Sequence, residues 1–172
     1  ILKDDGGPQN VKLGGTGINH HILLGGNTGS GKTSFIHTLI ISSCLKYSPE
    51  LLELILIDFK QGVEFQIYAD YKLPHAKFLG LESDREYALN ILLYLNKEMT
   101  RRADLCKDLG VADLTAYNNH PNQIKNPKNK LKRIVIIIDE FQEMLRGQDN
   151  IEMSIRELLD IITRLGRSFG IH

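Results

Sequence analysis

The chain has 172 residues, of which 42% are hydrophobic and 24% charged, so it is long enough to bury the core of one ordinary domain. Lysine plus arginine and aspartate plus glutamate are balanced at 21 each, which gives no indication of a nucleic-acid or membrane partner and leaves only a local basic patch open. No apolar run approaches the ~18–20 residues of a membrane span, and the two cysteines lack metal or redox spacing, so we expect a cytoplasmic domain in a reducing compartment.

Apolar runs alternate with helical periodicities along the chain. Short or continuous apolar runs predict strands at 22–24, 52–57, 77–79 and 134–138. Apolar residues on one helical face predict helices at 33–46, from a Ser83-Asp84 cap to about 109, in a short segment ending near 117, and at about 151–165. The segment 118–132, with two prolines and no acid, predicts a loop. This alternation predicts an α/β fold with a mainly parallel sheet flanked by helices.

The stretch GNTGSGKT at 26–33 fits the phosphate-binding pattern G-x-x-x-x-G-K-[ST] in full. A glycine-rich turn lets backbone amides converge on phosphate oxygens, and the helix that follows adds its positive N-terminus. We expect Lys32 to reach the β- and γ-phosphates of ATP and the Thr33 hydroxyl to ligate Mg²⁺. The predicted nucleotide-binding residues, called the phosphate cradle below, are Gly26, Asn27, Thr28, Gly29, Ser30, Gly31, Lys32, Thr33 and Ser34.

Two aspartates end apolar strands, and one of them is expected to hold the metal ion. Asp139 is followed directly by Glu140, so one carboxylate can face Mg²⁺ while its neighbour activates the attacking water. Asp58 is followed by Phe59 and Lys60 and has no such base beside it. We therefore assign Asp139 to the metal and Glu140 to general-base catalysis, against the alternative that the pair only opens the next helix.

Six blocks, in order, resemble the FtsK/SpoIIIE family of motor ATPases: GNTGSGKT, IDFKQGVEF (57–65), LPHA (73–76), KEMTRRADLCKDLGVADLTAYN (97–118), IVIIIDEF (134–141) and TRLGRSFGIH (163–172). The resemblance implies a RecA-like P-loop fold in a ring, usually a hexamer, that couples ATP hydrolysis to moving a polymer. The cargo it implies is double-stranded DNA, or secreted protein in the EssC/EccC branch. DFK in place of DPK, and the YSPELLELILIDF that leads into it, favour the secretion-type or mobile-element relatives. A regulatory nucleotide-binding module that does not turn over is a third alternative, opposed by the intact Lys32, Asp139 and Glu140.

In that family a further strand follows the G-I-H stretch and lies between the cradle strand and the D-E strand. This chain stops at His172, just before it. We therefore expect residues 1–172 to form one FtsK-type motor domain of a longer protein, with any membrane anchor outside this chain.

A ring ATPase needs an arginine that reaches the neighbouring subunit's γ-phosphate. The candidates are Arg101, Arg102, Arg164 and Arg167, of which Arg102 and Arg167 rank ahead. The alternative for each is a solvated or salt-bridged helix face. The lysines between 118 and 133 predict a solvated basic loop, with a phosphate-contacting channel loop as the alternative.

The remaining polar residues are not assigned to catalysis. Lys60 and Glu64 are expected at the ligand edge of the sheet, either tying it to the subunit interface or forming a local ion pair. Asp58 is expected to orient that edge rather than to hold the metal. His75 is expected to be structural, and His20-His21 lack metal-ligand partners, so Mg²⁺ is the sole metal predicted.

Overall fold

The computed structural model describes residues 10–13, 20–27, 29–60, 62–81 and 84–172. Within these residues three parallel strands form one sheet in the order β2-β1-β3. The strands are β1 (Leu52–Asp58), β2 (Ala76–Gly80) and β3 (Arg133–Asp139). The predicted α/β fold and strands at 52–57, 77–79 and 134–138 are thus confirmed.

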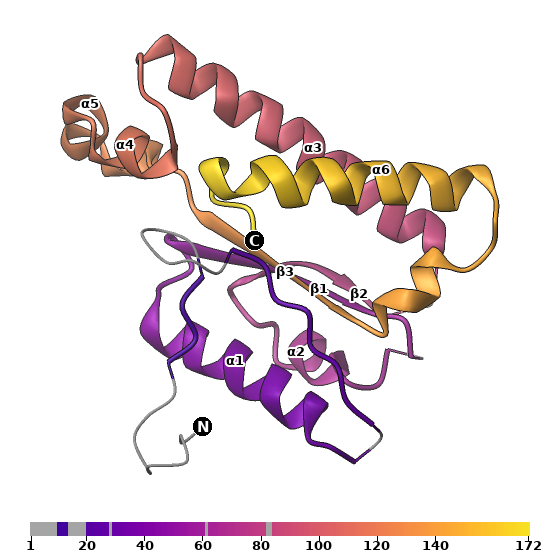
Figure 1. The fold of residues 1–172 in the computed structure, drawn as a ribbon. Helices are drawn as coiled ribbons and strands as arrows, with labels where there is room; N and C mark the ends of the chain where they lie inside the picture. The colour runs from indigo at the N-terminus through magenta and orange to yellow at the C-terminus, as the bar shows by residue number, and fades with distance from the viewer. Residues whose placement is uncertain (1–9, 14–19, 28, 61, 82–83) are drawn as a thin grey trace.

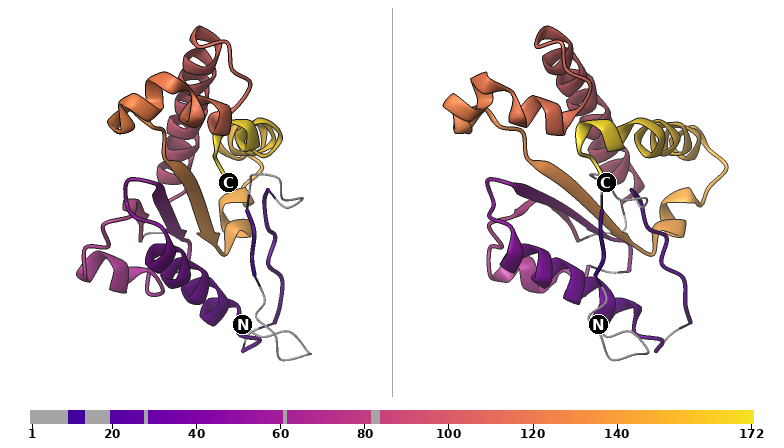
Figure 2. Two further views of the ribbon diagram at one scale, coloured as in Figure 1. Left: turned by 90° about the vertical axis from the view of Figure 1, so that its left-hand side faces the viewer. Right: turned by 60° about the vertical axis from the view of Figure 1, so that its left-hand side comes forward.

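Helices cover both faces of this sheet, as Figures 1 and 2 show. On one face lie α1 (Lys32–Lys46) and α2 (Gln66–Asp70), and on the other lie α3 (Arg85–Asp108) and α6 (Asn150–Leu165), which also pack against each other. Because both faces are covered, the strands carry continuous aliphatic runs rather than alternating ones. The shorter elements are α4 (Leu114–Asn119), α5 (Pro121–Lys125) and the 3-10 helices η1 (Pro127–Asn129), η2 (Phe141–Leu145) and η3 (Gly166–Phe169).

Two hydrophobic clusters hold these layers together. Beneath α1 and α2, Ile40, Phe65 and Tyr68 pack on side chains of β1. The larger cluster joins the opposite face of the sheet to α3 and α6, and Leu95 and Ile155 at its centre are 0% exposed. None of the described helices has both the length and the apolar character needed to cross a bilayer.

Aspartate caps fix where the predicted helices begin. The Asp84 carboxylate accepts from the backbone N–H of Glu86 at the start of α3, and Asp149 accepts from Glu152 at the start of α6. These bonds satisfy amides that have no partner within the helix. Residue 83 of the predicted Ser83-Asp84 cap lies outside the described residues.

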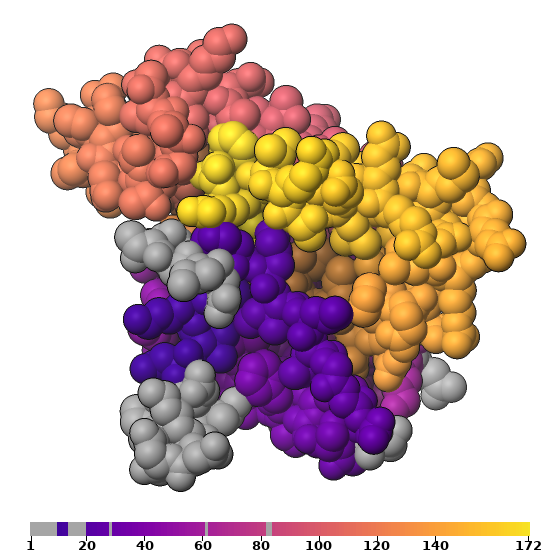
Figure 3. All heavy atoms as spheres, in the orientation of Figure 1, coloured from indigo at the N-terminus to yellow at the C-terminus, as the bar shows by residue number. Residues whose placement is uncertain are grey.

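Two of the predicted elements are wrong. Residues 22–24 form no strand, and Leu23 is 79% exposed. β3 has no edge free for them, because β1 takes one edge and residues 170–172 pair with the other through Ile134 and Ile136. Figure 3 shows residues 20–27 at the surface next to the C-terminal residues.

The predicted loop 118–132 is also largely wrong, because it contains α5 and η1 after the end of α4. Each of the two new elements begins with a proline, Pro121 and Pro127. The fixed φ of proline suits the first helical position, where its missing N–H costs nothing. Composition typical of a loop therefore concealed two short helical turns.

Candidate nucleotide site

The described part of the phosphate cradle forms a tight turn that leads directly into α1. Gly31, the residue before the helix, has φ 88° and ψ 13°, a left-handed conformation that glycine adopts without steric cost. No side chain caps the first amides of α1. Those amides are oriented as an anion-binding site at a helix N-terminus requires. Thr28 lies outside the described residues.

Lys32, the first residue of α1, turns its ammonium group back over the loop. Its Nζ donates to the carbonyl oxygens of Gly26 and, at 3.1 Å, of Asn27. The amide of Ser30 donates to the same Asn27 carbonyl, also at 3.1 Å, and closes the turn. The lysine therefore lies at the mouth of the loop, in position to meet phosphate oxygens.

One cavity of about 260 Å³ joins the cradle to the carboxyl ends of β1 and β3. Parallel strands end at one edge of a sheet, and that edge is where ligands gather in open α/β folds. The structure thus brings Lys32, Thr33, Asp139 and Glu140 together, as predicted from sequence. The cavity is lined by Asn27, Gly29, Gly31, Lys32, Thr33, Ser34, Lys60, Glu64, Asp139 and Glu140.

Asp139 ends β3 in a cluster of carboxylates. Burial raises the pKa of Asp139, and the neighbouring carboxylates of Asp58, Glu140 and Glu64 raise it further, while the Glu140 N–H, which donates to Asp139 Oδ1 at 3.0 Å, opposes the shift. A divalent cation would relieve this repulsion. Thr33 and Asp139 line the same cavity, so these residues fit Mg²⁺, which keeps few protein ligands and completes its shell with phosphates and water.

Glu140 has a backbone conformation that is unusual for its residue type. Its φ is 52° and ψ is 42°, in the left-handed region, where non-glycine residues are uncommon and strained. The side-chain amide of Gln142 donates to the Glu140 carboxylate. The turn into η2 thus sets the direction of the carboxylate assigned to general-base catalysis. No feature of the sequence signalled this role of Gln142.

Asp58 lies directly opposite Asp139 in the parallel register of β1 and β3 and is 0% exposed. Both of its oxygens accept backbone hydrogen bonds, Oδ1 from Lys60 at 2.7 Å and Oδ2 from Glu64 at 3.1 Å. These bonds occupy the carboxylate within its own loop. Lys60 and Glu64 form no ion pair with each other; instead, Glu64 lies 3.9 Å from His37 Nε2.

The four candidate arginines have different environments, and all lie away from the cavity. Arg102 is 3% exposed, and its guanidinium donates to Glu98 and to the carbonyls of Lys132 and Phe169, so it is occupied within this chain. Arg101 binds the same Glu98 through both carboxylate oxygens. Arg164 pairs with Asp160 at 2.9 Å.

Arg167, in η3, is exposed, and its guanidinium makes no hydrogen bond or ion pair with residues that the structure describes. Its environment favours it, rather than Arg102, as a residue that reaches a neighbouring molecule. Which arginine acts between subunits stays a prediction.

The histidines are placed by backbone contacts. His75, 8% exposed, has its Nε2 2.7 Å from the carbonyl of Tyr47 and donates to it, which agrees with the predicted structural role. His172 Nδ1 lies 3.2 Å from the His20 carbonyl, and burial is the main cause that lowers the pKa of His172 to about 4. Among the described residues no three His, Cys, Asp or Glu side chains form a metal site on their own.

P-loop ATPase domains share this combination of phosphate loop, helix start and paired acids at a strand end. Within that class, the chain belongs to the FtsK/SpoIIIE family, whose model matches residues 6–172. The family assignment made from the six sequence blocks is thereby confirmed.

Relatives with different described activities are similar to this chain. It is 36% identical over 152 residues to the DNA translocase FtsK of Clostridium tetani, a match that covers 88% of this chain and 19% of the relative. The structure superposes on the cytoplasmic domain of the Thermomonospora curvata type VII secretion ATPase EccC with a TM-score of 0.81 and 31% identity, over 99% of this chain and 20% of the other.

A third similar structure is the pCW3 conjugation coupling protein TcpA in its monomer form with ATPγS, with a TM-score of 0.67, 25% identity and coverage of 86% of this chain and 39% of that one. The chain thus spans about a fifth of the length of the FtsK and EccC relatives.

Proposed function

We propose that this chain is the ATP-hydrolysing domain of a ring motor that moves a polymer, and that double-stranded DNA is the first candidate for that polymer. The observation that carries the proposal is the convergence of Lys32, Thr33, Asp139 and Glu140 on one cavity. A lysine for phosphate charge, a metal-binding pair and a carboxylate to act as the base are the groups that phosphoryl transfer to water requires.

Each group has a distinct task in this proposal. Lys32 and the first amides of α1 hold the phosphates. Glu140 accepts a proton from the attacking water as the water oxygen bonds to the γ-phosphorus, while the bond from that phosphorus to the β–γ bridging oxygen breaks and ADP leaves. Thr33 and Asp139 would hold Mg²⁺, which supplies charge neutralisation on the phosphate oxygens. The contact from Gln142 keeps the Glu140 carboxylate oriented at the end of β3.

Hydrolysis is tested by Glu140→Gln in the intact protein. Loss of the general base is expected to lower ATP turnover by about 10²–10⁴-fold while equilibrium binding of a fluorescent ATP analogue is kept. Glu143→Gln is the matched control, because Glu143 lies three residues on and pairs with Arg146 at 2.8 Å outside the cavity. Unchanged turnover in Glu140→Gln would show that another group is the base, and no turnover in the wild type would favour the regulatory module.

Ring assembly follows from the family resemblance, with a hexamer as the expected state. Arg167 is the residue we propose for the neighbour's γ-phosphate, because it is exposed and its guanidinium has no partner among the described residues. Arg167→Met is expected to reduce turnover without weakening nucleotide binding, with Arg164→Met as the control. Turnover per chain should also rise with protein concentration; concentration-independent turnover would contradict the ring.

Duplex DNA as cargo is supported by the similarity to the DNA translocase FtsK and by the exposed Lys125 and Lys128. Stimulation of ATP turnover by duplex DNA should fall as salt rises, because counterions compete for the phosphates. The double variant Lys125→Met/Lys128→Met should weaken it. Absence of any stimulation at physiological salt would remove DNA as the cargo.

A protein cargo is the second candidate, favoured by the TM-score of 0.81 with the EccC ATPase over almost the whole chain. The same turnover assay distinguishes it: stimulation by a secreted partner protein, with no response to duplex DNA, would replace the first cargo with the second. Either result leaves the hydrolysis mechanism intact.

A further inference from the structure

Asp58 is a buried carboxylate whose only hydrogen-bond donors among the described residues are backbone amides. It is 0% exposed, and its two oxygens accept from Lys60 N and Glu64 N at 2.7 and 3.1 Å. A buried charge is costly unless it is hydrogen-bonded, so these two bonds are the favourable arrangement for the side chain. The consequence is that residues 60 and 64, six positions or fewer from Asp58, are fixed relative to the end of β1.

Gly62, between those two residues, has no room for a side chain. Gly62 has φ 68°, and a Cβ on it would lie 1.9 Å from the carbonyl oxygen of Leu81, so the backbone passes too close to its neighbour for any side chain. Phe59 and Phe65, on either side of the loop, are 4% and 1% exposed and lie in the two different cores. Phe59, Gly62 and Phe65 are thus each held against a different part of the fold.

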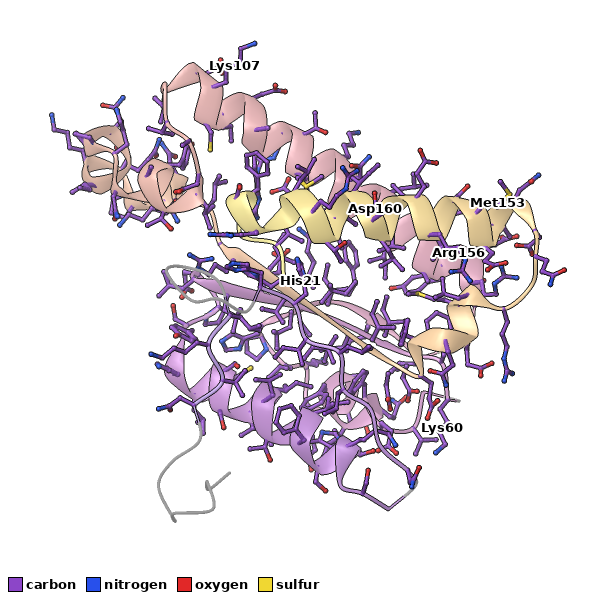
Figure 4. All side chains as sticks on the ribbon, in the orientation of Figure 1. His21, Lys60, Lys107, Met153, Arg156 and Asp160 are labelled. Carbon is purple, nitrogen blue, oxygen red and sulfur yellow. The ribbon has the colours of Figure 1, made fainter. Side chains whose placement is uncertain are left out.

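The hydrogen bond from Lys60 N to Asp58 places Lys60 beside the phosphate cradle. Lys60 lines the same cavity as Lys32, although the two lysines come from different parts of the chain. The side chain is exposed, and its ammonium makes no hydrogen bond or ion pair with the described residues. Figure 4 shows Lys60 on the side of the molecule where the strands end.

Charge in the cavity favours a phosphate partner for Lys60. The lining has three carboxylates, Glu64, Asp139 and Glu140, against the two lysines. A polyphosphate brought next to these acids requires cations, and a lysine binds phosphate as a point charge that needs no fixed orientation.

We propose that Lys60 is a second phosphate-binding cation of this site, directed at the terminal phosphate, and that Asp58 is the positioning residue that holds it there. The terminal phosphate is the target because Lys60 lines the cavity together with Glu140, the residue assigned to the attacking water. This inference rests on the proposed nucleotide hydrolysis and deepens it.

Equilibrium binding of fluorescent ATPγS and ADP to the intact protein tests Lys60. Loss of one charge-assisted contact in Lys60→Met is expected to raise the Kd for ATPγS about tenfold and the Kd for ADP by less than about threefold. Lys60→Arg, which keeps the charge, should stay within about threefold of wild type for both. Lys107→Met, at the far end of α3, is the control that should change neither (Figure 4).

Asp58→Asn tests the positioning role, because it replaces one acceptor oxygen with an NH₂ group, which cannot accept a hydrogen bond. It should lower the preference for ATPγS over ADP as Lys60→Met does, and the double variant should bind no more weakly than Lys60→Met alone, since both act through one contact. If Asp58→Asn does not fold, Gly62→Ala displaces the same loop and should give the same loss of preference.

The outcomes separate this inference from the proposed function. If wild type binds ATPγS and Lys60→Met binds it equally well, Lys60 is no phosphate ligand and the inference fails alone. If Lys60→Met weakens ATPγS and ADP equally, the terminal-phosphate assignment is wrong. Additive effects of Asp58→Asn and Lys60→Met would overturn the positioning role, whereas failure of wild type to bind either nucleotide would overturn the proposed function itself.

Discussion

Replacing Arg102 by methionine should destabilise the fold far more than replacing its neighbour Arg101. The Arg102 guanidinium joins three segments distant in sequence: it donates to Glu98 Oε1 and the Lys132 carbonyl at 2.8 Å and to the Phe169 carbonyl at 2.7 Å. Its side chain is 4% exposed, against 52% for Arg101, which binds the same glutamate. The two variants therefore remove the same charge from the same helix at different depths.

The expected magnitudes differ accordingly. Arg102→Met leaves a part-buried carboxylate with one partner and two carbonyls without their donor, for which about 3–5 kcal/mol is typical. Arg101→Met removes an exposed ion pair that contributes about 0–1 kcal/mol. With roughly 2–4 °C per kcal/mol for a chain of this size, Tm should fall about 10 °C further in Arg102→Met.

Thermal unfolding followed by circular dichroism measures both variants, and ATP turnover below their melting temperatures separates structure from catalysis. Folded Arg102→Met should keep most of its turnover if the residue acts within its own chain. Melting temperatures within about 2 °C of each other would refute the argument from burial. A stable Arg102→Met protein that has lost turnover would instead support the intersubunit role predicted from sequence.

Three further predictions concern the loop, the ion pairs and the core. Gly62→Ala should destabilise the protein by roughly 3 kcal/mol or more, because φ at this position is 68° and the new Cβ would meet the Leu81 carbonyl. Gly110→Ala has a similar φ of 64°, but its Cβ would have nothing within 4 Å, so it should cost only about 1 kcal/mol. Denaturant unfolding measures both. Burial raises the pKa of Glu98, but Arg101 and Arg102 together outweigh it and lower that pKa from 4.5 to about 2. The unfolded chain therefore binds a proton more readily than the folded one, and stability should fall as pH drops from about 4.5 towards 2. Glu98→Gln should flatten this part of the stability–pH curve by at most about 3 kcal/mol, and an unchanged curve would contradict the assignment. Ile155→Ala, at a 0% exposed position where α6 packs against α3, should lower the free energy of unfolding by about 2–5 kcal/mol. Met153→Ala, at a 68% exposed position of the same helix, should change it by no more than about 0.5 kcal/mol in the same denaturant measurement. Equal changes would place Ile155 outside the core.

Local sequence determined the parts of this protein whose physics is local. The aliphatic runs of β1 and β3 are typical of strands in a parallel sheet that helices cover on both faces. The cradle pattern requires glycines and a lysine at fixed spacing whatever surrounds it. The pairing of Asp139 with Glu140 at a strand end was likewise readable, because adjacent residues must lie at the same edge. These features predicted the fold class and the nucleotide site, and the six sequence blocks together led to the correct family.

Only the tertiary structure decided matters that depend on partners distant in sequence. Residues 22–24 are as apolar as a strand but form none, because residues 170–172 occupy the edge of β3. Arg102 and Arg167 look alike in sequence, yet one is buried among carbonyls and the other is exposed. Asp58 and Asp139 both end aliphatic strands. Backbone amides of Lys60 and Glu64 donate to Asp58, whereas Asp139 lines the cavity. The difference arises because only the path of the folded chain decides which donors come within reach of each carboxylate.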